Sequence, residues 1–270
     1  MAIKTNKYRK ILVLQTAYIG DVVVSTALIK ELNKLFPEST IDIISTPLSA
    51  EIFKYNPHIR KIHRFDKKNK KLINFFRLLS GIKKENYDLS ISIQSSFTSA
   101  MLLYLAGIER RIGFSKQILT TDSVRMIEAP ERHRSQNIVN LLSVLDDYEE
   151  FDFTTEIYFS EQEAKRARRI IKRAGKKDRK LIGIAPGSVR NTKEWTAEYF
   201  IKLVKMVGSD DIYLFFIGGE QEHQLCQKII EESENPATAN LAGDLSILES
   251  AALIDKMDLM ISNDSAPLHM

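Results

Sequence analysis

Short apolar runs rich in β-branched and aromatic residues alternate with longer amphipathic stretches along the whole chain. In the first half this pattern predicts strands at 10–14, 40–45, 61–65, 88–94 and 111–114. The stretches between and after these strands predict helices at 21–36, 48–55, 70–85, 98–106 and 135–145. Because strands that alternate with helices usually pair in parallel, the pattern indicates an α/β fold with mainly parallel sheets.

An acidic stretch at residues 146–159 interrupts this alternation and lacks helical periodicity, which is typical of an interdomain linker. It precedes Ser160-Glu161-Gln162-Glu163, a capping-box sequence that predicts the start of a helix. The alternation then restarts, with helices predicted at 161–174, 196–207, 220–232 and 246–254 and strands at 181–185, 212–217, 239–241 and 259–262. We therefore expect two successive α/β domains, at residues 1–150 and 151–270.

The last eight residues, 263–270, directly follow a predicted strand and resemble the loop and first turn of a helix that is not completed. A parallel sheet needs helices over both faces, so a last strand without its covering helix would leave apolar surface exposed. The pattern thus predicts a second domain that is truncated at its C-terminus.

Composition agrees with a globular chain, since 44% of the 270 residues are hydrophobic and 27% are charged. These values exclude a disordered or disulfide-stapled chain, and no run approaches the roughly 18 apolar residues of a membrane span. The basic N-terminus lacks the apolar run and cleavage site of a secretory signal. A single cysteine, Cys226, permits no internal disulfide and suits a reducing cytoplasm.

The net charge of +4 is unevenly distributed. Residues 1–150 hold 23 Lys and Arg against 16 Asp and Glu, whereas the remainder holds 16 against 19. The first half is thus the part expected to meet an anionic partner. Its densest cationic run extends from Lys54 to Lys71, which is compatible either with a solvated surface or with a contact to phosphorylated lipid or another polyanion.

The first strand is followed by the turn Gln15-Thr16-Ala17-Tyr18-Ile19-Gly20-Asp21. Ligands of open α/β sheets bind beyond the carboxyl ends of strands, so this turn is a candidate site. Its single glycine argues against the Gly-x-Gly-x-x-Gly grip on a dinucleotide. Asp21 has two open interpretations, a catalytic carboxylate or a helix cap that favours the helix dipole.

Two turns of the second half carry groups suited to phosphate. Residues 185–195 provide a glycine, the Ser188 hydroxyl and the cations Arg190 and Lys193 before a helix, although a solvated loop remains the alternative. Residues 262–267 place Asp264 and Ser265 at a helix start, where capping is the alternative. Glu220, after two glycines, has the chemistry to accept hydrogen bonds from ribose hydroxyls, unless it is a solvated first-turn residue.

Metal and thiol chemistry have little support in the sequence. The five histidines form no His-Glu-x-x-His pair, and no Asp-x-Asp motif is present. Cys226, between Leu225 and Gln227 on a predicted helix, is interpreted as a packed or surface thiol rather than a nucleophile.

Several spaced motifs, taken together, resemble glycosyltransferase family nine, and in particular the ADP-heptose:lipopolysaccharide heptosyltransferases. The similarity extends over essentially the whole chain. The matching segments, in order, are Ile11-Leu12-Val13-Leu14, Tyr18-Ile19-Gly20-Asp21-Val22-Val23, Arg111-Ile112-Gly113-Phe114, Pro186-Gly187-Ser188 with Lys193-Glu194-Trp195, Leu241-Ala242-Gly243 and Asn263-Asp264-Ser265.

The resemblance implies a GT-B fold of two Rossmann-like domains facing a cleft, with the acceptor on the first domain and the ADP-sugar donor on the second. Reaction would invert the anomeric carbon, and Asp21 would be the general base on the acceptor hydroxyl. The resemblance also implies that Gly20, Arg111 and His133 lie on the acceptor side. The acceptor would be the anionic inner core of lipopolysaccharide, in agreement with the basic first half.

On the donor side, the resemblance implies that Ser188, Val189 and Lys193 stabilise charge on the departing ADP, which makes Lys193 a catalytic residue as well. Glu220 matches a ribose-binding glutamate, and Asp264 and Ser265 match a second diphosphate loop. The expected partners are ADP-heptose and the lipopolysaccharide acceptor, with no metal, cofactor or nucleic acid. The expected location is the cytoplasm, with a peripheral contact at the cytoplasmic face of the inner membrane.

Family members continue past the segment that matches 263–269, and position 266 is alanine where relatives often have glycine. Three alternatives stay open at this point: a truncated, non-catalytic remnant, a family member with another sugar or acceptor, and a nicotinamide oxidoreductase. The last has the right fold class but lacks its glycine fingerprint.

Overall fold

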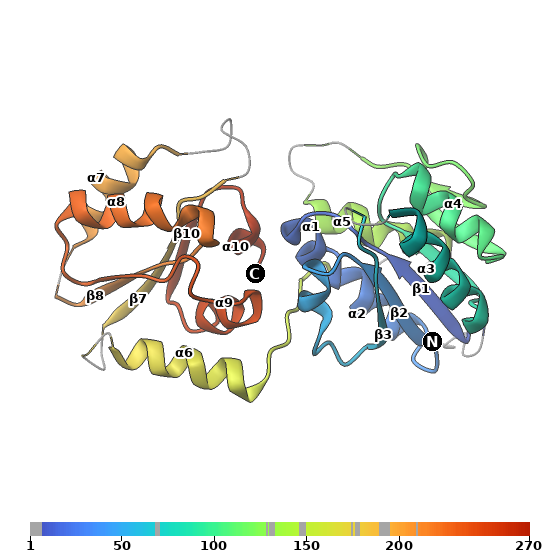
Figure 1. Ribbon diagram of the computed structural model, residues 1–270, viewed down its shortest axis with the longest axis horizontal. Helices are drawn as coiled ribbons and strands as arrows, with labels where there is room; N and C mark the ends of the chain where they lie inside the picture. Colours follow the sequence, from blue (N-terminus) through green and yellow to red (C-terminus); the bar gives the residue numbers. More distant parts are fainter. Residues whose placement is uncertain are drawn as a thin grey trace. The chain divides into compact units, whose positions relative to one another are not determined.

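The computed structural model describes residues 7–67, 71–127, 129, 133–145, 150–173, 175, 179–188, 195–208 and 210–270. The chain divides into two compact units, Met1–Ile157 and Tyr158–Met270, and each contains its own parallel sheet (Figure 1). The fold is therefore α/β, as the alternating pattern predicts.

The first unit contains a six-stranded sheet in the order β3-β2-β1-β4-β5-β6, and all its pairings are parallel. β1 is central, and its residues pair with β2 on one side and β4 on the other. The strands are β1 (Lys10–Leu14), β2 (Thr40–Ser45), β3 (Ile59–Arg64), β4 (Leu89–Ser92), β5 (Arg110–Phe114) and β6 (Asp122–Val124). β6, a three-residue edge strand, is too short to give a periodic signal and is missing from the sequence prediction.

Helices cover both faces of this sheet (Figure 1). Alternate residues of β1, such as Leu12 and Leu14, pack with α3 and α4 in one core cluster. α2 and α5 contact each other and belong to the other layer. The helical segments are α1 (Ile19–Val24), α2 (Thr26–Leu35), η1 (Ser49–Phe53), α3 (Lys71–Glu85), α4 (Phe97–Leu105), α5 (Arg134–Val139) and η2 (Asn140–Val144).

The single helix predicted at 21–36 is wrong in one respect, because it is two helices that meet at Ser25. The Ser25 hydroxyl donates to the Val22 carbonyl at 2.6 Å, and the Thr26 hydroxyl donates to the Val23 carbonyl at 2.7 Å. Hydroxyl groups that bond carbonyls of the preceding turn compete with the helical ladder and bend it.

The second unit has a four-stranded parallel sheet in the order β10-β7-β8-β9. α7 and α8 pack on one face around Ile184 and Phe216, and α6 and α9 pack on the other around Phe215 and Ile217. The elements are α6 (Glu161–Arg173), β7 (Lys180–Ala185), α7 (Ala197–Val207), β8 (Ile212–Phe216), η4 (Glu220–Glu222), α8 (His223–Ser233), β9 (Thr238–Asn240), α9 (Ile247–Ile254), β10 (Leu259–Ser262) and α10 (Ala266–His269).

Part of the acidic stretch between the sheets is fastened to the first unit. The Lys30 ammonium of α2 is buried and donates to Asp152 at 2.7 Å and to the Thr154 hydroxyl at 2.5 Å. The Glu156 amide donates to the Thr26 hydroxyl at 2.9 Å. The boundary between the two compact units accordingly falls after Ile157.

A charged cluster lies between β2, β3 and the end of α3. The fully buried Asp42 carboxylate receives the Arg60 guanidinium and, at 2.5 Å, the Tyr87 hydroxyl. Burial acts to raise the pKa of Asp42, but bonds from His63, Arg60 and Tyr87 outweigh it and hold that pKa well below its usual range. The cluster therefore stabilises the ionised carboxylate.

Candidate functional site

The loop after β1 is held by Gln15, a buried side chain. Its amide donates to the Asp21 carbonyl at 3.1 Å and accepts from the Ala17 amide at 3.2 Å. The Ser49 hydroxyl donates to the Ala17 carbonyl at 3.1 Å from η1. These bonds fix the turn from β1 into α1 at the carboxyl edge of the sheet, where open α/β folds bind ligands.

Asp21 lies in the first turn of α1 but does not cap it, because Tyr18 occupies the N-cap position and no side chain makes a cap hydrogen bond there. The Asp21 carboxylate instead pairs with Arg134, with 3.0 Å between Oδ1 and Nε. Its side chain is 26% exposed, so it is accessible to a bound molecule. Asp21 is therefore not the cap residue, but it lies in the first turn, where a carboxylate favours the helix dipole, and it forms an ion pair between two helices.

His133 and Arg134 begin α5, which contacts α1. His133 is the N-cap residue, and its Nδ1 accepts from the Ser135 amide at 3.3 Å. Arg134 is the first helical residue, a position where a cation opposes the helix dipole. The ion pair with Asp21 joins the start of α5, where His133 lies, to α1.

A second polar group lies at the same edge and joins the ends of three strands. The Thr16 hydroxyl, after β1, donates to the Gln94 amide oxygen, after β4. The Lys67 ammonium, after β3, donates to Thr16 at 2.7 Å. Burial, together with the charge of Lys71, lowers the pKa of Lys67. The edge near Asp21 therefore carries a half-buried cation beside neutral hydrogen-bonding groups.

The structure does not bring Arg111 to this edge. Arg111 is the second residue of β5, and its guanidinium donates to the carbonyls of Leu119 at 2.7 Å, Glu109 at 3.0 Å and Ile108. It also lies over the Tyr104 ring at 5.5 Å. These contacts fix the turns around β5. Gly20, by contrast, directly precedes Asp21 in α1.

Part of the cationic run at 54–71 forms ion pairs within the first unit. Arg60 and Lys61 pair with Glu85 at 2.8 and 2.7 Å, and Arg64 pairs with Glu51 at 3.3 Å. Lys68 and Lys70 lie outside the described residues. Three cations in the described part of the run thus pair with acids of the same unit, and their side chains stay exposed at the surface.

In the second unit, Asn263 joins the loops that follow β7 and β10. Its buried side chain donates to the Pro186 carbonyl at 2.6 Å and accepts from the Trp195 amide at 2.9 Å. Its own amide donates to the Ala185 carbonyl at 3.2 Å. One asparagine therefore joins the turn after β10 to Pro186 and to Trp195.

The glycine after Pro186 leaves room for a carboxylate. A Cβ on Gly187 would lie 2.3 Å from Cγ of Glu222, and one on Gly218 would lie 2.9 Å from the Glu222 Cβ. Glu222 in turn accepts from the Gly219 amide at 2.7 Å. Two strand-end loops thus close around the first turn before α8.

Glu220 lies beside the turn after β9. Gly243 has φ of +86° and its amide donates to the Gly218 carbonyl at 3.0 Å. A Cβ there would lie 2.5 Å from Glu220 Oε2, so glycine is required for this approach. Glu220 is exposed, which leaves its carboxylate accessible at the carboxyl edge of the sheet.

The other residues expected on the donor side are described only in part. Ser265 is the N-cap residue of α10 and its hydroxyl lies 3.2 Å from that of Ser262. Asp264 Oδ1 lies 3.9 Å from His269 Nε2. Ser188 follows Gly187 in the loop after β7, whereas Val189 and Lys193 lie outside the described residues. Ser188, Glu220, Asp264 and Ser265 all follow carboxyl ends of strands in one sheet.

The contacts of three residues at these sites cannot be predicted from the sequence. Arg134 lies more than a hundred positions from Asp21 and joins it only through folding. Asn263 looks like a helix cap, and Glu222 looks like an ordinary first-turn acid. The one usable signal is a basic residue at the start of a helix, where the dipole disfavours it.

Within the described ranges, no group of three or more His, Cys, Asp or Glu side chains is arranged to hold a metal ion. Cys226 is fully buried and burial raises its pKa to about 12, so of the two expected settings, packed or surface, the structure shows the packed one. None of the helices in the part of the chain that the structure describes is long and apolar enough to cross a membrane.

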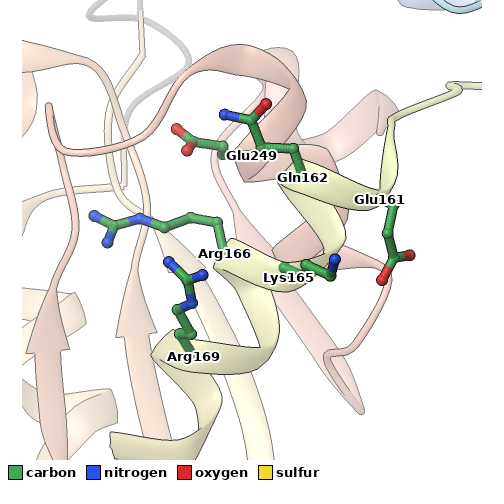
Figure 2. A pocket seen from close by; sticks show the side chains of 6 residues that line it. All are labelled: Glu161, Gln162, Lys165, Arg166, Arg169 and Glu249. Atoms are coloured by element: carbon green, nitrogen blue, oxygen red, sulfur yellow. The ribbon is translucent and has the colours of Figure 1, made fainter.

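A shallow hollow of about 350 Å³ lies away from these residues, between α6 and α9. Figure 2 shows the guanidinium groups of Arg166 and Arg169 next to each other on one side of α6, with Glu161 pointing away from them. The residues that line the hollow are Glu161, Gln162, Lys165, Arg166, Arg169 and Glu249. It shares no residue with the donor-side loops.

Solved structures with the same fold identify the class. A glycosyl transferase of family 9 from Veillonella parvula superposes with a TM-score of 0.86 at 24% identity, over 97% of this chain and 77% of that one. The Escherichia coli ADP-heptose lipopolysaccharide heptosyltransferase II superposes with a TM-score of 0.78 at 20% identity, over 95% and 80%. The two parallel α/β units are thus those of a GT-B fold.

Sequence comparison gives the family. Lipooligosaccharide heptosyltransferase 2 of Campylobacter jejuni is 26% identical over 270 residues, which cover 97% of this chain and 76% of the relative. The model of glycosyltransferase family 9 (heptosyltransferase) matches residues 75–270. The chain belongs to glycosyltransferase family 9.

Proposed function

We propose that the chain transfers a heptose from ADP-heptose to a hydroxyl of the lipopolysaccharide inner core, with inversion at the anomeric carbon. The family membership supports glycosyl transfer, and the relatives named above include lipooligosaccharide and ADP-heptose lipopolysaccharide heptosyltransferases. The observation that carries the proposal is the Asp21 carboxylate, which is accessible at the sheet edge and held by Arg134 rather than used as a cap.

Asp21 would act as the general base. Its carboxylate takes the proton of the acceptor hydroxyl while that oxygen forms a bond to the anomeric carbon. The bond between the anomeric carbon and the ADP oxygen breaks, and ADP leaves with the electron pair. Attack from the side opposite the leaving group inverts the configuration.

Arg134 would position that base. An ion pair 3.0 Å long between Nε and Oδ1 leaves the second carboxylate oxygen available to the acceptor hydroxyl. Lys67, hydrogen-bonded to Thr16 at the same edge, supplies a cation for the anionic groups of the core acceptor. Gly20 and His133, which flank this pair, belong to the acceptor side on the same reasoning.

The donor side of the proposal rests on the second unit. Ser188, Val189 and Lys193 would neutralise charge on the departing diphosphate, and Asp264 and Ser265 would form the second diphosphate loop. Glu220, exposed beside Gly243, would accept hydrogen bonds from the ribose hydroxyls. The proposal includes no metal, since these side chains would supply the stabilisation of the leaving group. Peripheral contact with the inner membrane is part of the same proposal.

The test is a transfer assay on the full chain with ADP-heptose and a panel of lipopolysaccharide core acceptors. We expect release of ADP that depends on the acceptor, and a product whose new linkage has the anomeric configuration opposite to that of the donor. A product with retained configuration, or turnover with a uridine-linked sugar but none with ADP-heptose, would contradict the proposal.

A further inference from the structure

The outward face of α3 carries large apolar side chains in its first two turns. Leu72, Ile73 and Phe76 are 72%, 57% and 62% exposed. The core side of α3 is the opposite face, with Phe75, Leu78 and Ile82, and the Phe76 ring touches it only at the edge of the Phe75 ring, with 5.6 Å between centroids. Exposed apolar residues gathered on one helix typically mark a contact with another molecule or with lipid.

Cations share this face. Arg77, Lys83 and Lys84 are exposed, and at 3.6 residues per turn they lie on the same side of α3 as the apolar residues. None of the three has an ion-pair partner among the described residues. The only acid of α3, Glu85, is turned to Arg60 and Lys61. The face is therefore apolar at its start, cationic along its length, and without a negative charge.

This face begins at the sheet edge that carries Asp21. α3 follows β3, so its first turns lie at the carboxyl ends of the strands. α4, which lies next to α3, begins there too and exposes Phe97 (Figure 1). The apolar side chains are thus placed on the acceptor edge of the first unit.

We propose that the outward face of α3 docks the chain on an anionic bilayer. Leu72, Ile73 and Phe76 enter the boundary between headgroups and acyl chains, as the apolar face of an interfacial helix does. The three cations face lipid phosphates, whose surface potential attracts them. Charge argues against a second copy of this chain as the partner of this face, because a symmetric contact through α3 would bring identical cations together.

The inference deepens the proposed function, since an acceptor held in the membrane would meet Asp21 at the same edge. The binding itself is independent of transfer and is measured separately. The full chain is floated with vesicles of phosphatidylethanolamine and phosphatidylglycerol, and with vesicles of phosphatidylcholine alone. We expect binding to the anionic vesicles, weakened by salt, and little binding to the neutral ones.

Two triple variants separate the contributions. Leu72→Ser/Ile73→Ser/Phe76→Ser is expected to lower vesicle binding by about 100-fold or more, since each side chain loses its burial in the boundary. Arg77→Gln/Lys83→Gln/Lys84→Gln is expected to lower it by a similar factor, since each cation near an anionic surface contributes about fivefold. Circular dichroism and thermal unfolding of each variant check that the fold is kept.

The matched control removes three cations from another exposed helix, as Arg166→Gln/Arg169→Gln/Lys172→Gln of α6. The control is expected to retain vesicle binding. Equal loss in both charge variants would overturn the proposal, because binding would follow net charge rather than α3. Absence of binding by the unaltered chain would also overturn it, as would a dimer in solution that the apolar variant dissociates.

A transfer assay keeps this inference distinct from the proposed function. The apolar variant is expected to transfer normally to a core oligosaccharide freed of its lipid, and poorly to the same core in vesicles. Equal rates on both acceptors would count against docking through α3. Failure of the unaltered chain on both would instead count against the proposed reaction.

Discussion

Replacing Asn263 by alanine removes the side chain that joins the two donor-side loops. Asn263 is 7% exposed, and it bonds the Pro186 carbonyl at 2.6 Å and the Trp195 amide at 2.9 Å. A buried polar group left without a partner costs about 1–3 kcal/mol, and less where water reaches it. The Pro186 bond is buried and the Trp195 bond is only partly so. We therefore expect the free energy of unfolding to fall by about 2–4 kcal/mol.

The assay is urea unfolding followed by tryptophan fluorescence. Trp195 is the single tryptophan of the chain and lies in the second unit, so its signal reports that unit alone. Asn263→Asp is the comparison, because its carboxylate still accepts from the Trp195 amide but places a buried, charged oxygen against the Pro186 carbonyl. At neutral pH its loss should be at least as large as that of the alanine variant. A fall of less than about 0.5 kcal/mol in the free energy of unfolding of Asn263→Ala would show that Asn263 does not hold the two loops together.

Binding gives a second measurement of the same change. The loops that Asn263 joins lead directly into Ser188 and into Asp264 and Ser265. Loosening them adds conformational entropy that ADP must remove on binding, so we expect ADP to bind about tenfold more weakly. Unchanged ADP affinity in a destabilised variant would leave Asn263 with a structural role only.

Three further predictions concern other residues. Arg134→Gln should lower turnover about tenfold with little change in ADP affinity or stability, because the pair is partly exposed, and Arg134→Lys should restore part of the rate. Gly243→Ala should weaken ADP binding and destabilise the chain by about 1 kcal/mol, measured by titration and unfolding, since its φ is +86° and Glu220 fills the space. The pKa values of Asp42 and Glu85 are lowered in the folded chain, that of Glu85 to about 2 from 4.5. The free energy of unfolding that these two carboxylates contribute is therefore present in full above pH 4.5 and is lost as the pH falls from there towards the lowered values. Asp42→Asn should flatten that part of a pH–stability profile.

The sheets and most helices could be predicted from the sequence because each depends on local periodicity. β1 and β10, for example, fall at their predicted bounds. The break at Ser25 could not be predicted, because it depends on whether the Ser25 and Thr26 hydroxyls hydrogen-bond to helical carbonyls or to water. β6 has only three residues, too few for a period to appear.

Side-chain partners were the less predictable part of the site. Ligands of open α/β sheets bind beyond the carboxyl ends of strands, and this rule places Asp21, Glu220 and Ser265 at sheet edges from the sequence alone. It says nothing of the Arg134 pair or of the bonds to Asn263, which join segments distant in the chain. The run at 54–71 shows the same limit, since its composition suggests a free cationic surface while Arg60, Lys61 and Arg64 form ion pairs with acids of the same unit.

The proposed reaction depends most directly on Asp21 as the base. The decisive measurement is the rate of heptose transfer by Asp21→Asn, beside its affinity for ADP and its unfolding midpoint. We predict that turnover falls by about 100-fold or more while ADP affinity and stability stay close to those of the unaltered chain. Turnover within a few-fold of the unaltered chain, with intact folding, would contradict the account.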